Sequence, residues 1–201
     1  MNIDDFLEAV ASEPPRVVSR TVRTVLPEAL AAARKRGGIL LEAFLALPAT
    51  METREVEYRH IVGPPASIGA VEQWKKQHPA HSLPAELTDL LGRFNGVHLW
   101  ADSLWGRAYV GLSPIEEWQL ARRRFYDDTP DPILYDDRFV LISYHQDNSF
   151  HAVADLASGT YHLFDTTGSA ELSLIAEDVG GLLDWIWSSR IDPTAESGAP
   201  R

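Results

Sequence analysis

The stretch SLPAELTDLLGRFNGVHLWADSLWGRAYVGLSPIEEW, residues 82–118, decides the fold that we expect for this chain. Its first part predicts a helix, because apolar residues recur every three or four positions before the Asn95-Gly96 pair. This pair ends the helix, since both residues tolerate the left-handed backbone conformation. Two short apolar segments follow, residues 97–100 and 108–112, and the polar loop between them predicts a β-hairpin.

The end of this stretch carries the signals of a second helix start. Ser113 can cap a helix, Pro114 suits the first helical position, and Glu116 stands where a capping-box carboxylate reaches back. We therefore expect a helix that passes through Trp118 and the arginines of residues 122–124. A helix, a hairpin and a helix form a scaffold, and by themselves they indicate no chemistry.

The N-terminal part of the chain is more mixed. Residues 2–11 predict a short amphipathic helix with Asn2 as its cap. Residues 16–25 fit either a helix or a strand, because valines recur at helical spacing but β-branched residues favour strands. A helical stretch opened by Pro27 leads to residues 56–62, where apolar and charged residues alternate as in a half-exposed strand.

The rest of the chain returns to strands and closes with a helix. An amphipathic helix is expected around residues 68–74. Residues 139–144, 150–156 and 161–164 predict three strands of an antiparallel meander, with a turn at the glycine between the last two. The apolar residues of segment 176–187 share one helical face.

Together these elements predict an α+β fold, in which a twisted, mostly antiparallel sheet is flanked by helices. The Gly63-Pro64-Pro65 segment marks the expected boundary between two parts of the chain. Residues 1–62 form an N-terminal helical extension with one strand, residues 63–191 form the main domain, and residues 192–201 form a flexible tail.

Composition narrows the class of protein. No run approaches the roughly 18 uninterrupted apolar residues of a membrane span, and the acidic N-terminus lacks the pattern of a secretory signal. The 201 residues include no cysteine, which excludes disulfides and cysteine nucleophiles and fits a reducing compartment. We therefore expect a cytoplasmic protein that does not associate with membranes.

The net charge of −11 is unevenly distributed. Residues 1–62 hold 8 basic and 9 acidic side chains, whereas residues 63–201 hold 10 basic and 20 acidic ones. Such a negative field repels phosphate backbones, so we expect no nucleic-acid partner. It attracts a basic protein, although acidity can also serve solubility alone.

The order of motifs from residue 68 to residue 188 resembles the SUKH superfamily, the Smi/Knr cell-wall-regulator-like domains. An amphipathic helix precedes LP-x-E-L…FNG, residues 83–96, and a hairpin leads to GLSPIEEW, residues 111–118. The strand FVLISY follows, then the D-L-x-x-G turn of residues 155–159 entering YHLFD, and a closing helix that contains LLDWI. The resemblance covers about 120 residues. Residues 1–62 lie outside it, and His145-Gln146-Asp147-Asn148-Ser149 departs from the glycines and acidic residue that the family often has before the meander.

This resemblance implies the same α+β fold and a protein that needs no catalysis. Bacterial members of the superfamily are immunity proteins that bind and neutralise a cognate toxin, often a nuclease. Fungal members are regulatory scaffolds in cell-wall assembly. The resemblance therefore implies a protein partner and no cofactor.

Two groups of residues are candidates for binding a partner. Trp100 and Trp105 bracket Asp102 in the predicted hairpin loop, where tryptophan can anchor an interface or close the end of a core. Aspartates gather after the predicted second helix, and one more stands in the loop between the first two strands of the meander, where they can attract a basic surface or simply be solvated. These aspartates are Asp127, Asp128, Asp131, Asp136, Asp137 and Asp147.

Histidines and aspartates also gather in the meander, at His145, Asp147, His151, Asp155, His162 and Asp165. His151 and His162 are expected on paired strands, which raises the alternative of a metal site or a small hydrolase. However, no HExxH, G-x-S-x-G or phosphate-loop motif is present, and both Asp155 and Asp165 fall where turns favour aspartate. His78 and His81 alone leave a metal's coordination unfilled. We therefore expect no metal, no cofactor and no enzymatic activity.

The hypothesis that follows is a non-enzymatic immunity protein that neutralises a basic, nuclease-type toxin by direct binding. A regulatory scaffold that docks through the Trp100–Trp105 loop is the alternative. The sequence leaves the oligomeric state and the identity of the partner open.

Overall fold

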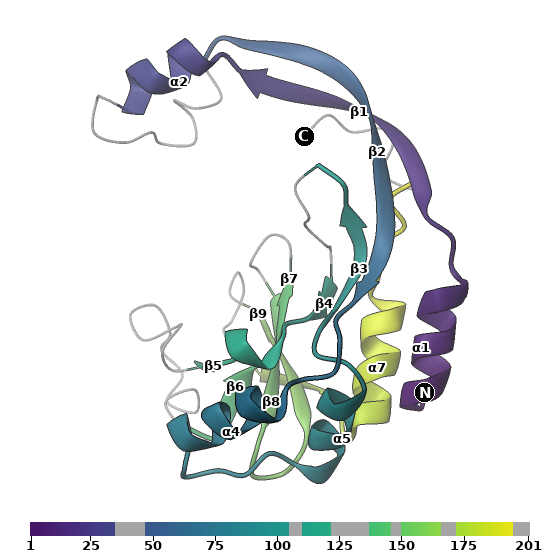
Figure 1. Ribbon diagram of the computed structural model, residues 1–201, viewed down its shortest axis with the longest axis vertical. Coiled ribbons are helices and arrows are strands. Elements are labelled where there is room, and N and C mark those ends of the chain that lie inside the picture. The colour runs from purple at the N-terminus through teal and green to yellow at the C-terminus, as the bar shows by residue number, and fades with distance from the viewer. Residues whose placement is uncertain (35–46, 105–109, 122–136, 146–149, 166–171, 195–201) are drawn as a thin grey trace.

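The computed structural model describes residues 1–34, 47–104, 110–121, 137–145, 150–165 and 172–194 (Figure 1). The predicted α+β class is confirmed, because antiparallel strands and helices both build the molecule. The strands form two antiparallel sheets instead of the single sheet that we expected. Sheet A has the order β1-β2-β3-β4-β7, and sheet B has the order β10-β9-β8-β6-β5.

Sheet A begins with a long two-stranded arm. Strands β1 (Arg16–Val25) and β2 (Ala49–Val62) pair over ten consecutive positions, and helix α2 (Pro27–Arg34) follows β1. The arm arches away from the rest of the molecule and carries α2 at its far end (Figure 1). β2 then pairs with β3 (Val97–Asp102), which pairs with β4 (Val110–Leu112), and β4 pairs with β7 (Ser143–His145).

Sheet B contains the predicted meander. Strands β6 (Phe139–Leu141), β8 (Phe150–Asp155) and β9 (Tyr161–Asp165) are antiparallel neighbours, and β5 (Gln119–Leu120) and β10 (Leu172–Ala176) flank them. The expected strand over residues 139–144 is split at Ile142, where the chain passes from sheet B to sheet A. Ile142 is fully buried; its N–H donates to the Ala152 carbonyl, and its carbonyl accepts from the N–H of Ser113. One residue therefore joins the two sheets.

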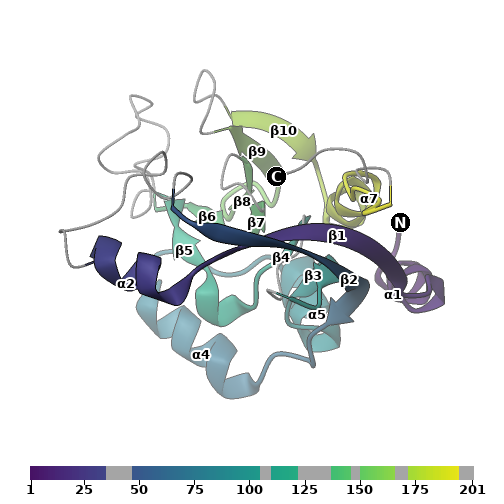
Figure 2. The same ribbon diagram turned by 90° about the horizontal axis from the view of Figure 1, so that it is seen from above.

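Four helices cover the sheets: α1 (Ile3–Ser12), α4 (Ile68–Gln77), α5 (Ala85–Arg93) and α7 (Val179–Ser188). Viewed from above, α4 and α5 lie on one side of the β1–β2 ribbon and β9 and β10 on the other, with α1 beside α7 (Figure 2). The predicted apolar faces of α1, α5 and α7 are confirmed and meet in one main core, to which α4 adds Trp74 while its Ile68 is exposed. The fully buried members of this core include Phe6, Leu87, Phe94, Leu99, Leu182 and Ile186.

The helix predicted from Pro114 onward is wrong. Residues 115–117 form a 3-10 turn, η1 (Ile115–Glu117), and strand β5 follows it, whereas the arginines of residues 122–124 lie outside the described residues. The cap comes from Asn95, whose Oδ1 accepts from the Ile115 N–H at 2.7 Å. The Trp118 indole N–H then donates to the Ser113 carbonyl at 2.8 Å and turns the chain back. This buried indole bond outweighs the local helix signals.

Residues 1–62 are not a separate extension. Phe6 and Val10 of α1 belong to the main core, and β2 pairs with β3 of the segment that we had expected to form the main domain. The ambiguous segment 16–25 is a strand. The arm has its own small core at its base, formed by Val18, Val56, Tyr58 and Trp100.

Candidate functional site

The predicted binding residues only partly fall within the described structure. Six of them lie outside the described residues: Trp105, Asp127, Asp128, Asp131, Asp136 and Asp147. Asp137 is half-buried, two residues before the start of β6. The acidic loop therefore stays a prediction for all but its last residue.

Trp100 and Asp102 are placed differently from our expectation of exposed anchors, and this is a correction. Trp100 is only 1% exposed, because its indole packs with Val18, Val56 and Tyr58 at the base of the arm. Its backbone has φ +56°, which is uncommon for a residue other than glycine. Asp102 is also buried, and its Oδ1 accepts from the Leu104 N–H at 2.9 Å. The alternative, that Trp100 closes the end of a core, is the one that its burial supports.

The meander histidines lie on paired strands as expected, as diagonal neighbours on one face of the sheet and not as a directly opposed pair. His151 is opposite Phe164, and His162 is opposite Val153. His162 is half-buried, lies edge-on to Phe139, and its Nε2 is 2.9 Å from the Thr160 hydroxyl. Asp155 accepts from the Ala157 N–H, as expected for a turn aspartate.

His78, in the loop after α4, behaves as a structural residue too. His78 stacks on Trp74, and its Nδ1 lies 2.9 Å from the Trp74 carbonyl. Across the residues that the structure describes, no group of three or more histidine and acidic side chains is arranged to hold a metal ion.

A cluster that the sequence did not indicate surrounds His60 at the base of the arm. The His60 side chain is 2% exposed and lies between the rings of Trp100 and Trp187, at centroid distances of 4.2 and 5.8 Å. Its Nε2 is 3.0 Å from Glu13 Oε2, and Arg190 Nε is 3.3 Å from the same oxygen. Arg16 Nη2 lies 3.2 Å from the other Glu13 oxygen.

The bonds of His60 define its protonation. The Trp100 backbone N–H donates to Nδ1 at 3.1 Å, so the ring proton is on Nε2 and points to Glu13. Burial lowers the pKa of His60, the Glu13 hydrogen bond and charge oppose this, and the charges of Arg190 and Arg16 add to the lowering. Both ring nitrogens are therefore occupied in a neutral imidazole. Because neither nitrogen has a free lone pair, this arrangement fastens the arm and is unsuited to general-base chemistry.

The Glu13 carboxylate stays ionised in the same cluster. Burial raises its pKa, but the His60 hydrogen bond and the positive charge of Arg190 outweigh burial, so the pKa of Glu13 lies below its ordinary value. Arg190 also stacks on Trp187, with its guanidinium 3.6 Å from the ring centroid. The cluster thus joins α1, the arm and the end of α7.

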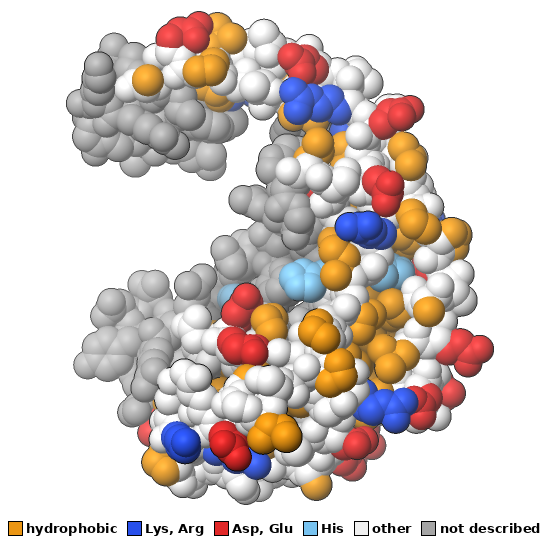
Figure 3. Space-filling model, in the orientation of Figure 1, with side chains coloured by type: hydrophobic (Ala, Val, Ile, Leu, Met, Phe, Trp, Pro, Cys, Tyr) orange, Lys and Arg blue, Asp and Glu red, His pale blue; other side chains and the backbone are white. Residues whose placement is uncertain are grey.

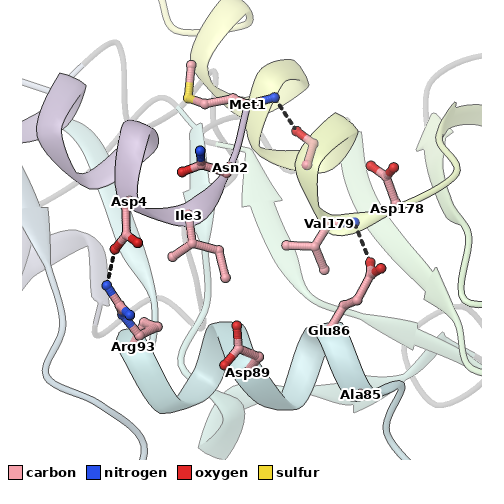
Figure 4. Close-up of a pocket in the computed structure, with 11 residues that line it drawn as sticks. Met1, Asn2, Ile3, Asp4, Ala85, Glu86, Asp89, Arg93, Asp178 and Val179 are labelled. Atoms are coloured by element: carbon pink, nitrogen blue, oxygen red, sulfur yellow. Dashed lines mark hydrogen bonds and ion pairs between the residues drawn. The ribbon is translucent and has the colours of Figure 1, made fainter.

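A second feature is a hollow of about 630 Å³ where the starts of α1, α5 and α7 meet (Figure 4). Four carboxylates line this acidic hollow: Asp4, Glu86, Asp89 and Asp178. Four more exposed carboxylates lie on the same helices or directly before α7: Asp5, Glu8, Glu177 and Asp184. Among the described lining residues, Arg93 is the one basic side chain.

Some of these carboxylates also have structural bonds that fix their positions. Asp178 caps α7, since its Oδ1 accepts from the Gly181 N–H at 2.7 Å. Glu86 Oε2 accepts from the Val179 N–H at 3.3 Å, and Arg93 forms an ion pair with Asp4 across the hollow (Figure 4). Acidic side chains also gather around the start of α1 on the surface (Figure 3). The hollow is therefore a preorganised, strongly negative surface.

The hollow was missed because its residues are distant in the sequence. Asp4, Asp89 and Asp178 come from three helices that only the tertiary fold brings together. The available signals were the acidic first turns of α1 and α5 and the capping aspartate of α7, each of which is a local feature of one helix. Nothing in the sequence alone indicates that the three helix starts converge.

Comparisons with known proteins assign no family to this chain. In the part of the chain that the structure describes, no helix has both the length and the apolar character needed to cross a bilayer. No protein-family model matches this chain, and no curated protein matches its sequence.

Proposed function

We propose that this chain is a non-enzymatic binding protein that neutralises a basic protein toxin by direct association, as the resemblance to SUKH immunity proteins implies. The observation that supports this most is the acidic hollow and its rim. Four carboxylates line the hollow and four more exposed ones lie on or beside the same helices. Among the described lining residues they face two cationic groups, the Arg93 guanidinium and the Met1 ammonium, which pair with Asp4 and Asp184. A basic partner is the ligand that such a surface attracts most strongly.

The physical role of this surface is to speed association and to orient the partner. Exposed charges are screened over about 8–10 Å at physiological salt, so a group of carboxylates acts together only when they are close in space. The acidic hollow meets this condition because its carboxylates come from adjoining helix starts. Its negative charge also disfavours nucleic acid as the direct ligand. A toxin that binds nucleic acid has the basic surface that fits.

The alternative of a regulatory scaffold that docks through the Trp100–Trp105 loop has less support. Trp100 is buried and is not available as an anchor, and Trp105 lies outside the described residues. That alternative predicts binding that persists at high salt, because apolar burial dominates it. Our proposal predicts binding that weakens as salt rises.

The experiment is a neutralisation assay. The partner is captured from the source cell on the immobilised chain and identified. Its gene is then expressed in a test cell with and without this protein. We expect rescue from toxicity and a dissociation constant that rises steeply with salt. A captured partner that is harmless, or toxicity that co-expression leaves unchanged, contradicts the proposal.

A further inference from the structure

A second hollow lies on the same helix as the acidic one, at the opposite end of α1. It has a volume of about 410 Å³ and lies between the second half of α1 and the end of β2. Most of its lining is apolar, from Leu7, Val10, Ala11, Pro15 and Val62. Hydrophobic side chains gather on the surface at the base of the arm, where β2 leaves the body (Figure 3). We call this feature the apolar hollow.

Two of the three polar residues that line the apolar hollow are already engaged, and the third, Arg59, is exposed. Glu13 and His60 line it, but they bond to each other, to Arg190 and to the Trp100 backbone. They therefore offer little to a polar ligand. Val62 is 37% exposed and Ala11 is exposed, so apolar surface here faces solvent.

One stripe of α1 joins the two hollows. Ile3 lines the acidic hollow, and Leu7 and Ala11 line the apolar one. Residues four positions apart lie on the same face of a helix, so these three side chains form a continuous row. At 1.5 Å per residue, the row spans about 12 Å. A single segment of a partner can therefore reach both hollows at once.

We propose that the occupant of this row is a basic amphipathic segment of the partner, and this inference rests on the proposed function. Its lysine or arginine side chains lie in the acidic hollow, and one bulky apolar side chain enters the apolar hollow. Charge complementarity defines the basic half of the occupant, because the carboxylates of Asp4, Glu86, Asp89 and Asp178 line the hollow at the other end of the row. A helical segment spans the distance with about eight residues, and an extended one with about four.

The test uses two synthetic helical peptides of equal positive charge. Both carry lysines in one half; the first carries leucines eight positions away, and the second carries serines in their place. We expect the full-length protein to bind the leucine peptide about tenfold more tightly, because the apolar hollow buries a leucine side chain. Amide chemical shifts of the labelled protein locate each peptide.

Matched variants distinguish binding in the apolar hollow from nonspecific binding to exposed apolar residues. Ala11→Gln places a polar side chain in the apolar hollow and retains good helix propensity. Ile68→Gln makes the corresponding change at a residue that is 80% exposed on α4, outside both hollows. We expect Ala11→Gln to abolish the preference for the leucine peptide and Ile68→Gln to retain it.

The outcomes distinguish this inference from the proposed function. Equal affinity for both peptides, or a preference that Ala11→Gln leaves intact, overturns the inference while binding at the acidic hollow still stands. If neither peptide binds, both the proposed function and the inference fail.

Discussion

His60 and Glu13, which are 47 positions apart, are joined by a hydrogen bond of 3.0 Å between Nε2 and Oε2. This bond connects β2 of the arm to the segment that follows α1. The Trp100 amide occupies the other ring nitrogen, and Arg190 holds the same carboxylate from beyond α7. The base of the arm is therefore fixed by a buried polar cluster, in addition to the small core around Trp100.

This cluster predicts that acid destabilises the protein. The pKa of His60 is lowered in the folded state, so below its ordinary value of 6.5 the unfolded chain binds a proton that the folded chain does not. The contribution of His60 to the free energy of unfolding is therefore fully present above pH 6.5. The free energy of unfolding falls as the pH decreases below this value. One proton contributes at most about 1.4 kcal/mol per pH unit. Glu13, whose pKa is also lowered, adds a further loss below its ordinary value of 4.5.

The variant His60→Gln tests this directly, because glutamine can still donate to Glu13 but does not titrate. We expect the slope of unfolding free energy against pH between 6.5 and 5 to decrease in this variant, measured by urea denaturation at several pH values. His81→Gln, in the loop after α4, is the control and retains the wild-type slope. An unchanged slope in His60→Gln contradicts the account of the cluster.

Trp100 provides a second prediction, about stability. Trp100→Ala removes a fully buried indole from the base of the arm, and we expect a loss of about 3–5 kcal/mol in unfolding free energy. Val17→Ala is the comparison, since Val17 lies on β1 but is 60% exposed, and it should cost less than about 0.5 kcal/mol. Similar losses in the two variants, measured by chemical denaturation, show that Trp100 does not support the arm.

The helices and most strands were predictable because their signals are local. α1, α5 and α7 each bury residues at helical spacing, and Asn2 caps α1 as its sequence position predicts. The hairpin of β8 and β9 also follows from alternation and from Gly159, whose φ is +76°. These features need no information from distant residues.

The errors arise where a distant residue outweighs the local pattern. Asn95 and the indole of Trp118 replace the predicted helix after Pro114 with a short turn. Ile142 divides an apparently continuous strand between two sheets, and only its bonds to Ala152 and Ser113 reveal this. The acidic hollow escaped prediction for the same reason, since its carboxylates converge only in the folded chain.

The contact between β3 and β4 predicts a strong effect at Gly111. A Cβ at this position would lie 2.1 Å from the Val97 carbonyl oxygen on the paired strand, so Gly111→Ala forces the two backbones apart. We expect a loss of about 3 kcal/mol in unfolding free energy. Gly92→Ala is the matched control, because nothing lies within 4 Å of its Cβ and α5 should gain about 0.5–1 kcal/mol. Thermal unfolding of both variants checks these signs, and a stable Gly111→Ala protein contradicts the described strand register.

The acidic hollow predicts that charge removal weakens binding of a basic ligand. The double variant Glu8→Gln, Asp89→Asn removes two exposed carboxylates from α1 and α5. We expect its affinity for the lysine–serine peptide, the second of the two synthetic peptides above, to fall about 3- to 10-fold at low salt. The difference should be smaller at high salt because of screening. Fluorescence anisotropy measures this. Glu55→Gln on the exposed face of the arm is a single-charge control and should have little effect; an equal fall there indicates attraction by net charge alone.

The most direct test of the central claim is to locate a basic ligand on the folded protein. The lysine–serine peptide is titrated into the isotope-labelled chain at low salt, and amide chemical shifts are followed. The account predicts that the shifts concentrate at the starts of α1, α5 and α7, around Asp4, Asp89 and Asp178. Shifts that spread evenly over the surface, or that centre on α4 or the arm, contradict it.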